Sequence, residues 1–430
     1  MRKVLIITYY WPPSGGAGVQ RWLKFVKYLR EFNWEPVIYT PENPENPEED
    51  NSLLKDVPDN ITILKTPIWE PYNFYKRFIG HKKTQKISAG FLSENKKPKL
   101  PEKIAVWIRG NLFIPDARRF WINNSVKYLS DYLAKNKINV IISTGPPHSM
   151  HLIALKLKKK INIPWLADFR DPWTNIDFYK DLKLTNRADK KHRKLEQKVL
   201  SNADKVIVIS KTMAEDMKRL HNRHYDVITN GYDTEDLQTT TLKMDNKFSL
   251  AHIGTMPKTR NPELLWKVLN KLVNEDSQFV SDLEIKLVGK VDYSVVESLK
   301  QYNLSDFYNK INYLPHDEVI RIQQQSQVLL LLINNTPNAK MILTGKFFEY
   351  LAARRPILCI GPTDGDAAKI LFETKAGYIS DFDDEETLKK NIIILYSEYK
   401  AGILQSHNKG IERFSRKNLT KELAGLMANF

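Results

Sequence analysis

The chain has 430 residues, 42% of them hydrophobic, and a formal net charge of +16. This length is typical of two domains rather than one, and the hydrophobic content excludes a disordered chain. The single cysteine, Cys359, excludes an intramolecular disulfide and a cysteine metal cluster. No apolar run approaches the roughly 20 residues of a membrane span, so the sequence predicts a cytoplasmic protein.

A glycine-rich turn separates the first predicted strand from the first predicted helix. Val4–Thr8 is an apolar run of strand length, and apolar positions recur at helical spacing over Val19–Leu29. Between them lie Gly15, Gly16 and Gly18. Backbone N–H groups at the start of such a helix form an anion site, which predicts a phosphate-bearing ligand. The alternative is a tight turn without a ligand, because a dinucleotide fingerprint would have a third glycine where Arg21 stands.

Strands and helices alternate along both halves of the chain. In the first half we expect strands over 35–40, 60–66, 139–143, 164–168 and 205–210, with a helix over 149–159. In the second half we expect strands over 248–254, 284–289, 311–314, 328–333 and 356–361, with helices over 262–272 and 346–353. This alternation predicts an α/β protein with two Rossmann-like doubly wound domains facing a cleft.

A polar stretch that begins at Thr234 indicates the domain boundary. We expect residues 1–235 to form the N-terminal domain and residues 245–411 the C-terminal domain. The terminal helix over 412–430 is expected to pack back on the first domain.

The segment from Lys76 to Trp121 is strongly basic and rich in aromatic residues. It holds twelve Lys and Arg against three acids, a local balance of +9. This mixture fits an anionic membrane surface, and the alternatives are nucleic acid or a solvated face with a small core of its own. Because no recognised nucleic-acid motif accompanies the charge, we expect no nucleic-acid partner. We predict peripheral contact with the inner face of the cell membrane through residues 76–121.

Two motifs of the second half place charged residues beside predicted strand and helix ends. In AHIGTMPKTRNPELL, a predicted strand is followed by a loop that carries Lys258 and Arg260. In GKFFEYLAARRPIL, Gly345 precedes a helix on which Lys346 and Glu349 lie three residues apart and therefore on one face. The alternatives are a solvated basic loop for the first motif and a surface ion pair for the second.

The chain resembles the retaining GT-B glycosyltransferases of family 4. The resemblance rests on the two motifs above and on PPSGGAGVQR, STGPPHSMHLIA, ADFRDPW, VITNGYD and RFSRKNLTKELAGLM, in this order over nearly the whole chain. It implies a nucleotide-sugar donor on the C-terminal domain and an acceptor on the N-terminal domain.

The resemblance also assigns roles to donor-site residues. It implies that Lys258 and Arg260 hold the nucleotide diphosphate and that Glu349 accepts hydrogen bonds from the ribose hydroxyls. The helix N-terminus at Gly345 and Lys346 is expected to help hold the phosphates. The turn from Gly15 to Gly18 would then lie against the donor's phosphates and sugar.

Three catalytic candidates lie in the first half. His148 belongs to STGPPHSM, and Asp168 and Arg170 lie at the carboxyl end of a predicted strand in ADFRDPW. Many family members have a histidine after the first of these strands, near the sugar carbon that reacts, but here the aligned position is Ser143 or Thr144. ADFRDPW resembles part of the family's acceptor side. The alternative for Asp168 and Arg170 is a buried salt-bridge cluster that ties loops together.

Two further features bear on the donor and on metals. Many family members have two glutamates eight positions apart, and here Met341 replaces the first, which touches the donor sugar in the family. The run DFDD near Asp381 resembles the metal motif of the other glycosyltransferase fold, but helix capping explains it better because it leads into EETLKK. We therefore expect no catalytic metal and no cofactor, with the nucleoside diphosphate sugar as a substrate.

Taken together, the sequence predicts a metal-independent, retaining glycosyltransferase of the hexosyltransferase type. It would transfer a sugar from a nucleoside diphosphate to a lipid-linked or saccharide acceptor in cell-surface polysaccharide biosynthesis. A nucleotide-sugar epimerase of the same fold is one alternative, since it would use the same donor site without an acceptor. A non-enzymatic nucleic-acid-binding protein would explain the charge but not Glu349 or the two-domain pattern.

Overall fold

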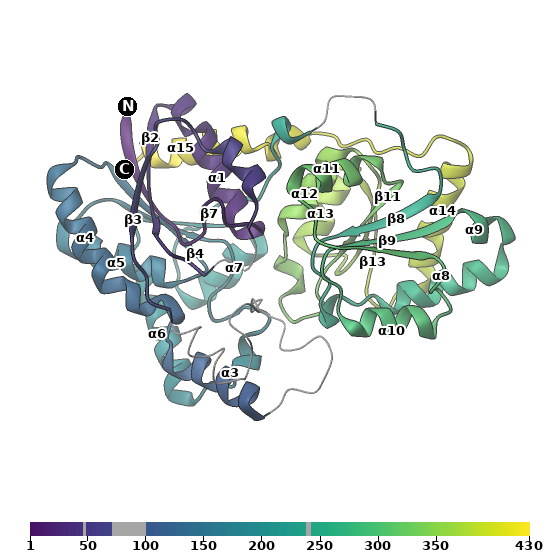
Figure 1. Ribbon diagram of the computed structural model, residues 1–430, viewed down its shortest axis with the longest axis horizontal. Coiled ribbons are helices and arrows are strands. Elements are labelled where there is room, and N and C mark those ends of the chain that lie inside the picture. Colours follow the sequence, from purple (N-terminus) through teal and green to yellow (C-terminus); the bar gives the residue numbers. More distant parts are fainter. Residues whose placement is uncertain (46–48, 71–99, 238–241) are drawn as a thin grey trace. The chain divides into compact units, whose positions relative to one another are not determined.

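The computed structural model describes residues 1–45, 49–70, 100–237 and 242–430. The chain divides into two compact units, one comprising Met1–Thr229 with Lys417–Phe430 and the other comprising Asn230–Arg416. Each unit is a parallel sheet covered by helices (Figure 1). The α/β architecture with two Rossmann-like doubly wound domains is therefore confirmed.

The first unit is built on a seven-stranded sheet in the order β3-β2-β1-β4-β5-β6-β7. Its described strands are β1 (Arg2–Ile7), β2 (Trp34–Pro41), β3 (Thr62–Thr66), β4 (Val140–Gly145), β5 (Trp165–Phe169), β6 (Lys205–Val208) and β7 (Asp226–Val227). Its described helices are α1 (Ala17–Leu29), α3 (Leu100–Leu112), α4 (Ile122–Lys135), α5 (Ser149–Ile161), α6 (Asn186–Asn202), α7 (Lys211–Leu220) and, at the chain end, α15 (Arg416–Ala428).

The second unit is built on a six-stranded sheet in the order β10-β9-β8-β11-β12-β13. Its strands are β8 (Phe248–Ile253), β9 (Leu283–Val288), β10 (Tyr308–Ile311), β11 (Val328–Leu332), β12 (Ile357–Ile360) and β13 (Gly377–Ser380). Its helices are α8 (Glu263–Glu275), α9 (Ser277–Asp282), α10 (Tyr293–Gln301), α11 (His316–Gln325), α12 (Gly345–Ala353), α13 (Asp366–Thr374) and α14 (Glu385–Lys400).

The buried parts of the central strands are mostly apolar, because helices cover both faces of each sheet. In β1, Val4 to Ile7 are fully buried, and every residue of β11 is buried. Val4 lies opposite Pro36 of β2 and Val140 of β4. These runs are the ones that the apolar pattern of the sequence identified.

The predicted strand over 311–314 is wrong in position, and β13 was not predicted. The strand found there is β10, which spans Tyr308–Ile311 at the edge of its sheet. Its sequence YNKI does not alternate apolar and polar residues, and its residues are half-buried or exposed. An edge strand of this kind carries little hydrophobic signal.

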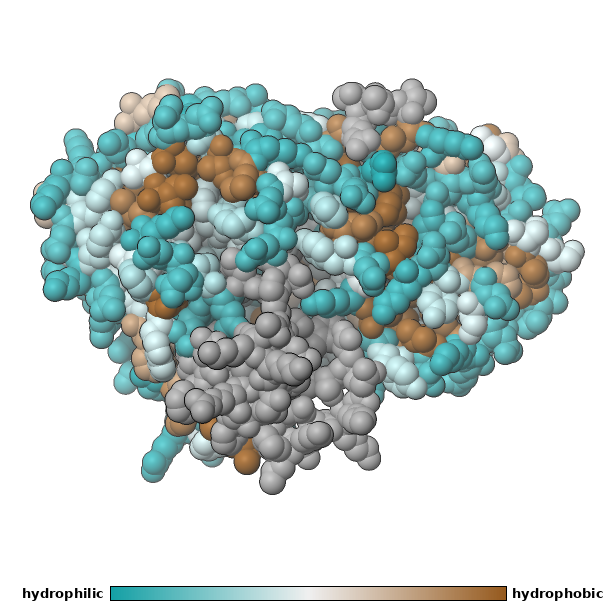
Figure 2. Space-filling model, in the orientation of Figure 1, coloured by the Kyte–Doolittle hydropathy of each residue, from teal (hydrophilic) through white to brown (hydrophobic). Residues whose placement is uncertain are grey.

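The terminal helix packs on the first unit. Leu419, Leu423 and Met427 of α15 belong to one buried cluster with Val4 of β1 and Val26 of α1. The division between the units falls at Thr229 and Asn230, close to the boundary expected at residue 235. Hydrophilic side chains cover most of the described surface in view, with hydrophobic ones in smaller patches (Figure 2). Within the described ranges, no helix combines the length and apolar character that crossing a membrane requires.

In both sheets the strand order reverses at one point. The reversal lies between β1 and β4 in the first unit and between β8 and β11 in the second. Ligands of doubly wound sheets bind beyond the carboxyl ends of the strands at such points. The glycine turn follows β1, and the loop with Lys258 and Arg260 follows β8, so the topology places both motifs where a ligand is expected.

Candidate functional site

The loop after β8 is held to the loop after β11. Gly254 directly follows the strand and has a φ of 109°, a conformation that favours glycine. Arg260 donates from Nη1 to the Thr255 carbonyl at 2.6 Å and from Nε to Asn334 Oδ1 at 2.9 Å. Arg260 is thereby fixed at the carboxyl edge of the sheet. Lys258, at the start of the same short turn, is exposed.

Lys346 lies directly over Gly254. A Cβ atom at Gly254 would stand 2.9 Å from Nζ of Lys346, so the amino group occupies the space that a larger residue would fill. Nζ also lies 3.4 Å from Nε2 of His252, a fully buried residue of β8. The Nδ1 of His252 is 3.1 Å from the carbonyl of Leu330. Since a carbonyl only accepts, Nδ1 carries the proton and Nε2 is left to accept from Lys346.

The environment of Lys346 lacks a fully compensating negative charge. Burial first, and then the charge of Arg260, lower the pKa of Lys346 well below its ordinary value. Burial and the two cations likewise lower the pKa of His252. A phosphate bound here would favour the charged ammonium and reverse this shift. The cluster therefore has the electrostatics of an anion site.

The start of α12 is open. Thr344 is the N-cap residue, but its side chain makes no capping hydrogen bond. A Cβ added at Gly345 would meet no atom within 4 Å. The first backbone N–H groups of a helix have no partner within the helix, and they carry partial positive charge. This end of α12 therefore adds donors beside Lys346.

Glu349 lies one turn further along α12 and contacts α11. Its Oε2 accepts a hydrogen bond from Nε2 of Gln323 at 3.1 Å. In the part of the chain that the structure describes, no ion pair joins Glu349 to Lys346, so the expected alternative of a surface ion pair is not formed. Met341, which stands where many family members have a first glutamate, is 7% exposed. Arg260 and Glu349 both interact electrostatically with Lys346, so the three residues form one cluster.

In the first unit, Asp168 is a fully buried carboxylate. The register of β4 and β5 places it opposite Thr144, whose Oγ1 donates to it at 2.9 Å. Arg21 of α1 pairs with it at 2.9 Å, and Trp22 Nε1 donates at 2.8 Å. This is the salt-bridge alternative foreseen for Asp168, with Arg21 as the partner that sequence reasoning missed. A contact between Asp168 and an acceptor stays a prediction.

Arg170 packs against the glycine turn and forms a hydrogen bond to it. Arg170 donates from Nη1 to the Gly18 carbonyl at 2.8 Å and from Nη2 to the Pro146 carbonyl. A Cβ at Gly18 would lie 3.0 Å from the Tyr10 ring and 3.3 Å from Nη1 of Arg170. Gly16 has a φ of 89°, and Gly15 is buried. The chain itself therefore requires small residues here, while contact of this turn with a donor stays a prediction.

His148 and His151 meet beside Gly145. The His148 ring stacks on Trp173 with centroids 4.5 Å apart, and burial lowers its pKa well below the ordinary value. His151, which sequence reasoning missed, lies 2.8 Å from Ser143 Oγ, and burial lowers its pKa to about 3. A Cβ at Gly145 would lie 2.5 Å from Nε2 of His151 and 3.0 Å from Nδ1 of His148. Both imidazoles are therefore neutral near pH 7, and a catalytic role for His148 stays a prediction.

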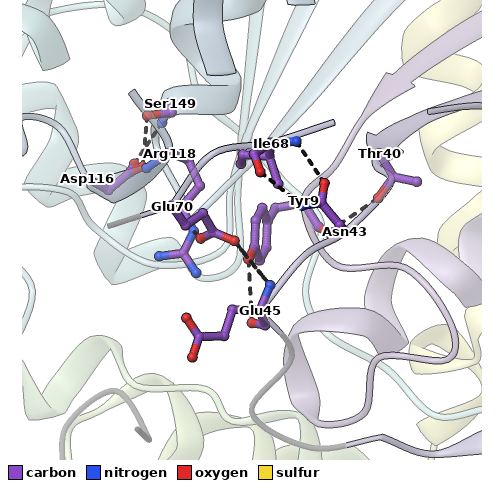
Figure 3. A network of polar contacts seen from close by, with 9 residues as sticks. All are labelled: Tyr9, Thr40, Asn43, Glu45, Ile68, Glu70, Asp116, Arg118 and Ser149. Carbon is purple, nitrogen blue, oxygen red and sulfur yellow. Dashed lines mark hydrogen bonds and ion pairs between the residues drawn. The ribbon is translucent and has the colours of Figure 1, made fainter. Parts of the chain in front are cut away.

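A polar network that the sequence did not reveal ties the loops after β1, β2 and β3 (Figure 3). Tyr9 donates to Glu70 Oε2 at 2.7 Å and accepts from the Glu45 backbone at 3.0 Å. Arg118 pairs with Glu70 at 3.0 Å and lies over the Tyr9 ring at 4.3 Å. Burial raises the pKa of Glu70. The network braces the same carboxyl edge at which Asp168 lies.

Of the predicted basic segment, residues 76–99 lie outside the described residues. In the described remainder, Trp107 and Phe120 are more than 40% exposed, whereas Trp121 is buried and stacked on Tyr39. The run DFDD does serve in capping: Asp384 accepts from the backbone N–H of Thr387 at 3.0 Å at the start of α14.

Comparisons with known proteins agree with this architecture. Residues 85–236 match the family model of Glycosyltransferase Family 4. Sucrose-phosphate synthase from Thermosynechococcus elongatus has a TM-score of 0.63 at 14% identity, covering 100% of this chain and 99% of its own. WaaG, a glycosyltransferase involved in lipopolysaccharide biosynthesis, has a TM-score of 0.60 at 10% identity, covering 99% and 100%. The chain has the GT-B glycosyltransferase fold, and its resemblance to the family 4 type is confirmed.

The same fold also occurs in a protein of a different reaction class. A putative UDP-N-acetylglucosamine 2-epimerase from Listeria monocytogenes has a TM-score of 0.55 at 12% identity, covering 100% of this chain and 96% of its own. No curated protein sequence matches the chain.

Proposed function

We propose that this chain is a retaining glycosyltransferase that transfers a hexosyl group from a nucleoside diphosphate sugar. The observation that carries the proposal is the cluster of Arg260, Lys346 and Glu349 at the carboxyl ends of β8 and β11. Lys346 interacts electrostatically with both other members, and its close polar neighbour is the neutral ring of His252. Two cations fit a diphosphate, and a carboxylate one turn away fits ribose hydroxyls.

The same residues account for leaving-group departure. As the glycosidic bond breaks, negative charge grows on the diphosphate, and fixed cations stabilise that charge most in the transition state. Arg260 is held by two hydrogen bonds and Lys346 by packing over Gly254, so little reorganisation is needed. We propose that Lys258 adds a further charge from the exposed turn and that these cations replace a divalent metal.

For the acceptor we propose a lipid-linked or other saccharide of a cell-surface polysaccharide. The fold shared with WaaG, which takes part in lipopolysaccharide biosynthesis, supports this choice. The basic segment over 76–121 supports peripheral attachment to the inner face of the cell membrane, where such acceptors are elongated. A nucleotide-sugar epimerase is the second candidate, since a protein of that class shares the fold.

Lys346→Met tests the donor site. Methionine keeps most of the side-chain volume and removes the charge, so we expect the fold to persist and the affinity for UDP, GDP or ADP to fall. The loss of a charged hydrogen bond corresponds to about 1.5–3 kcal/mol, which is tenfold or more in the dissociation constant. Isothermal titration calorimetry measures it. Lys310→Met, an exposed lysine on edge strand β10, is the matched control and should bind as the wild type does.

The product then separates the two candidates. With a donor sugar and an oligosaccharide acceptor, a transferase forms a new glycoside with the donor's anomeric configuration, whereas an epimerase changes the sugar without forming one. Nuclear magnetic resonance distinguishes the two. Transfer should persist in excess chelator. Activity that is lost with chelator and restored by Mg²⁺ or Mn²⁺ would contradict metal independence.

A further inference from the structure

Gln323 of α11 is a buried amide in apolar surroundings. Its side chain is 0% exposed, and its Oε1 has no hydrogen-bond partner among the described residues. Val319 and Ile322 of the same helix pack against an apolar cluster that includes Phe347 of α12. A buried oxygen without a partner destabilises the fold, so an apolar residue would be favoured here on stability alone.

Among the described residues, the one hydrogen bond of the Gln323 side chain goes to Glu349. Nε2 donates to Glu349 Oε2 at 3.1 Å. The opposite orientation of the amide would bring Oε1 against the carboxylate, two acceptors facing each other, so charge complementarity fixes the amide as described. The bond joins α11 to α12 and restrains the carboxylate, which is otherwise half-buried.

Glu349 bonds to Gln323 and not to Lys346. Glu349 and Lys346 lie three residues apart on one helix face, the spacing at which opposite charges commonly pair. In the described chain no ion pair joins them, while Oε2 of Glu349 accepts from Gln323.

We propose that Gln323 is a positioning residue that holds the Glu349 carboxylate in place for the ribose hydroxyls of the donor. The proposal rests on the proposed function, because it concerns the same nucleotide site. It implies that the amide is kept at the expense of stability. The two effects therefore have opposite signs and can be measured separately.

The substitution Gln323→Met separates the effect on stability from the effect on nucleotide affinity. Methionine has a similar length without the amide, so we expect the melting temperature to stay the same or rise. A merely structural amide would instead lower it. The affinity for the tightest-binding of UDP, GDP and ADP should fall about tenfold, the loss of one hydrogen bond to a charged group acting through Glu349. The affinity for pyrophosphate, and for the 2′,3′-dideoxy form of that nucleotide, should change less than about twofold.

Two controls accompany this measurement. Gln325→Met makes the same change on the same helix, where the amide donates to the Lys243 carbonyl at an exposed position, and should leave all affinities unchanged. In a Glu349→Gln background, Gln323→Met should cause no further loss of ribonucleotide affinity, because the two residues then act through one interaction. Calorimetric titration of the full chain provides each value.

The outcomes distinguish the two proposals. If the wild type binds none of the three nucleotides, the proposed function fails and this inference with it. If the wild type binds but Gln323→Met retains full ribonucleotide affinity, or loses pyrophosphate equally, the positioning role alone is wrong. Should Gln323→Met not fold, Gln323→Leu decides. Leucine also removes the amide from this buried position, so ribonucleotide affinity should fall about tenfold while pyrophosphate affinity changes less than about twofold. Wild-type ribonucleotide affinity in this variant would overturn the proposal.

Discussion

At the scale of single residues, Asp168 and Arg21 form a buried ion pair in the first unit. Both side chains are at most 2% exposed. Removing one charge of a buried pair leaves the other uncompensated, which typically costs about 3–5 kcal/mol. We expect Asp168→Asn to lower the free energy of unfolding by about this amount in urea titrations. Glu31→Gln, which breaks the exposed pair with Lys417, should change it by about 1 kcal/mol or less.

The stability that Asp168→Asn loses should depend on pH in a defined way. Burial alone raises the pKa of Asp168, but the charge and hydrogen bonds of Arg21 outweigh it, and the net pKa lies below the ordinary value. A carboxyl with a depressed folded pKa contributes stability above its unfolded pKa of about 3.9 and loses it as the pH falls through the folded value. The difference between wild type and Asp168→Asn should therefore shrink below about pH 4. A difference that stays constant to pH 2 would contradict this.

The sequence indicated Asp168 as a member of this pair but not Arg21. It identified Asp168 as part of a possible salt-bridge cluster from the local run ADFRDPW. It did not find Arg21, which is 147 positions away, or His151, Tyr9 and Glu70. His151 lies only eight positions from its partner Ser143, within the run STGPPHSMHLIA. Arg21 with Asp168, and Tyr9 with Glu70, lie far apart in the chain and are brought together by the arrangement of the sheet. No local pattern of residues carries that information.

At the scale of elements, the carboxyl end of β8 determines where the Lys346 ammonium lies. In Gly254→Ala the new methyl group would stand 2.9 Å from Nζ, so the ammonium must move. We expect pyrophosphate affinity to fall about tenfold or more, in line with the loss of a charged hydrogen bond. Gly402→Ala is the matched control: its φ of 70° is also positive, but a Cβ there meets nothing within 4 Å.

Both glycine variants should lose about 1 kcal/mol or more of stability, since an alanine is strained at positive φ. Gly254→Ala alone should lose pyrophosphate binding in calorimetric titrations. An equal loss of pyrophosphate affinity in both variants would indicate global destabilisation. Unchanged affinity in both would mean that Lys346 does not bind the anion. The sequence predicted a strand that ends at Gly254, and β8 ends one residue earlier, at Ile253. That the glycine makes room for Lys346, 92 positions later, depends on α12 packing over β8.

Central strands were predicted more accurately than the edge strands of the second sheet. The apolar runs of β1, β8 and β11 are buried on both faces and were predicted. The edge strands β10 and β13 have half-buried residues for the most part, and they were shifted or missed. Their pairing depends on a neighbouring strand rather than on an apolar pattern. The residues proposed for the donor site follow β8 and β11 at the centre of the sheet, where the strands were predicted.

At the scale of the whole molecule, the net charge of +16 predicts attraction to anionic surfaces. The segment over 76–121 carries a balance of +9 of it, although residues 76–99 lie outside the described residues. Basic residues near an anionic bilayer contribute about 1 kcal/mol each. Trp107 and Phe120, the exposed rings of the described part, are of the kind that enters the interface.

We therefore expect the full chain to co-sediment with vesicles of phosphatidylserine and phosphatidylcholine at low salt, and not with phosphatidylcholine alone. Binding should weaken strongly toward 1 M salt, where the Debye length is about 3 Å. The variant that tests the segment replaces five lysines by glutamate: Lys82, Lys83, Lys96, Lys97 and Lys99. The control makes the same change in charge at exposed lysines of α5 and α6: Lys159, Lys160, Lys190, Lys191 and Lys194.

If the segment is the contact, the first variant loses vesicle binding, the control keeps most of it, and both still bind the nucleotide. Equal losses in the two variants would mean that net charge alone attracts the chain to the bilayer. A wild type that ignores acidic vesicles at low salt would remove the membrane from the proposal. The acceptor would then be sought among soluble saccharides, since a lipid-linked one is presented only at the membrane surface.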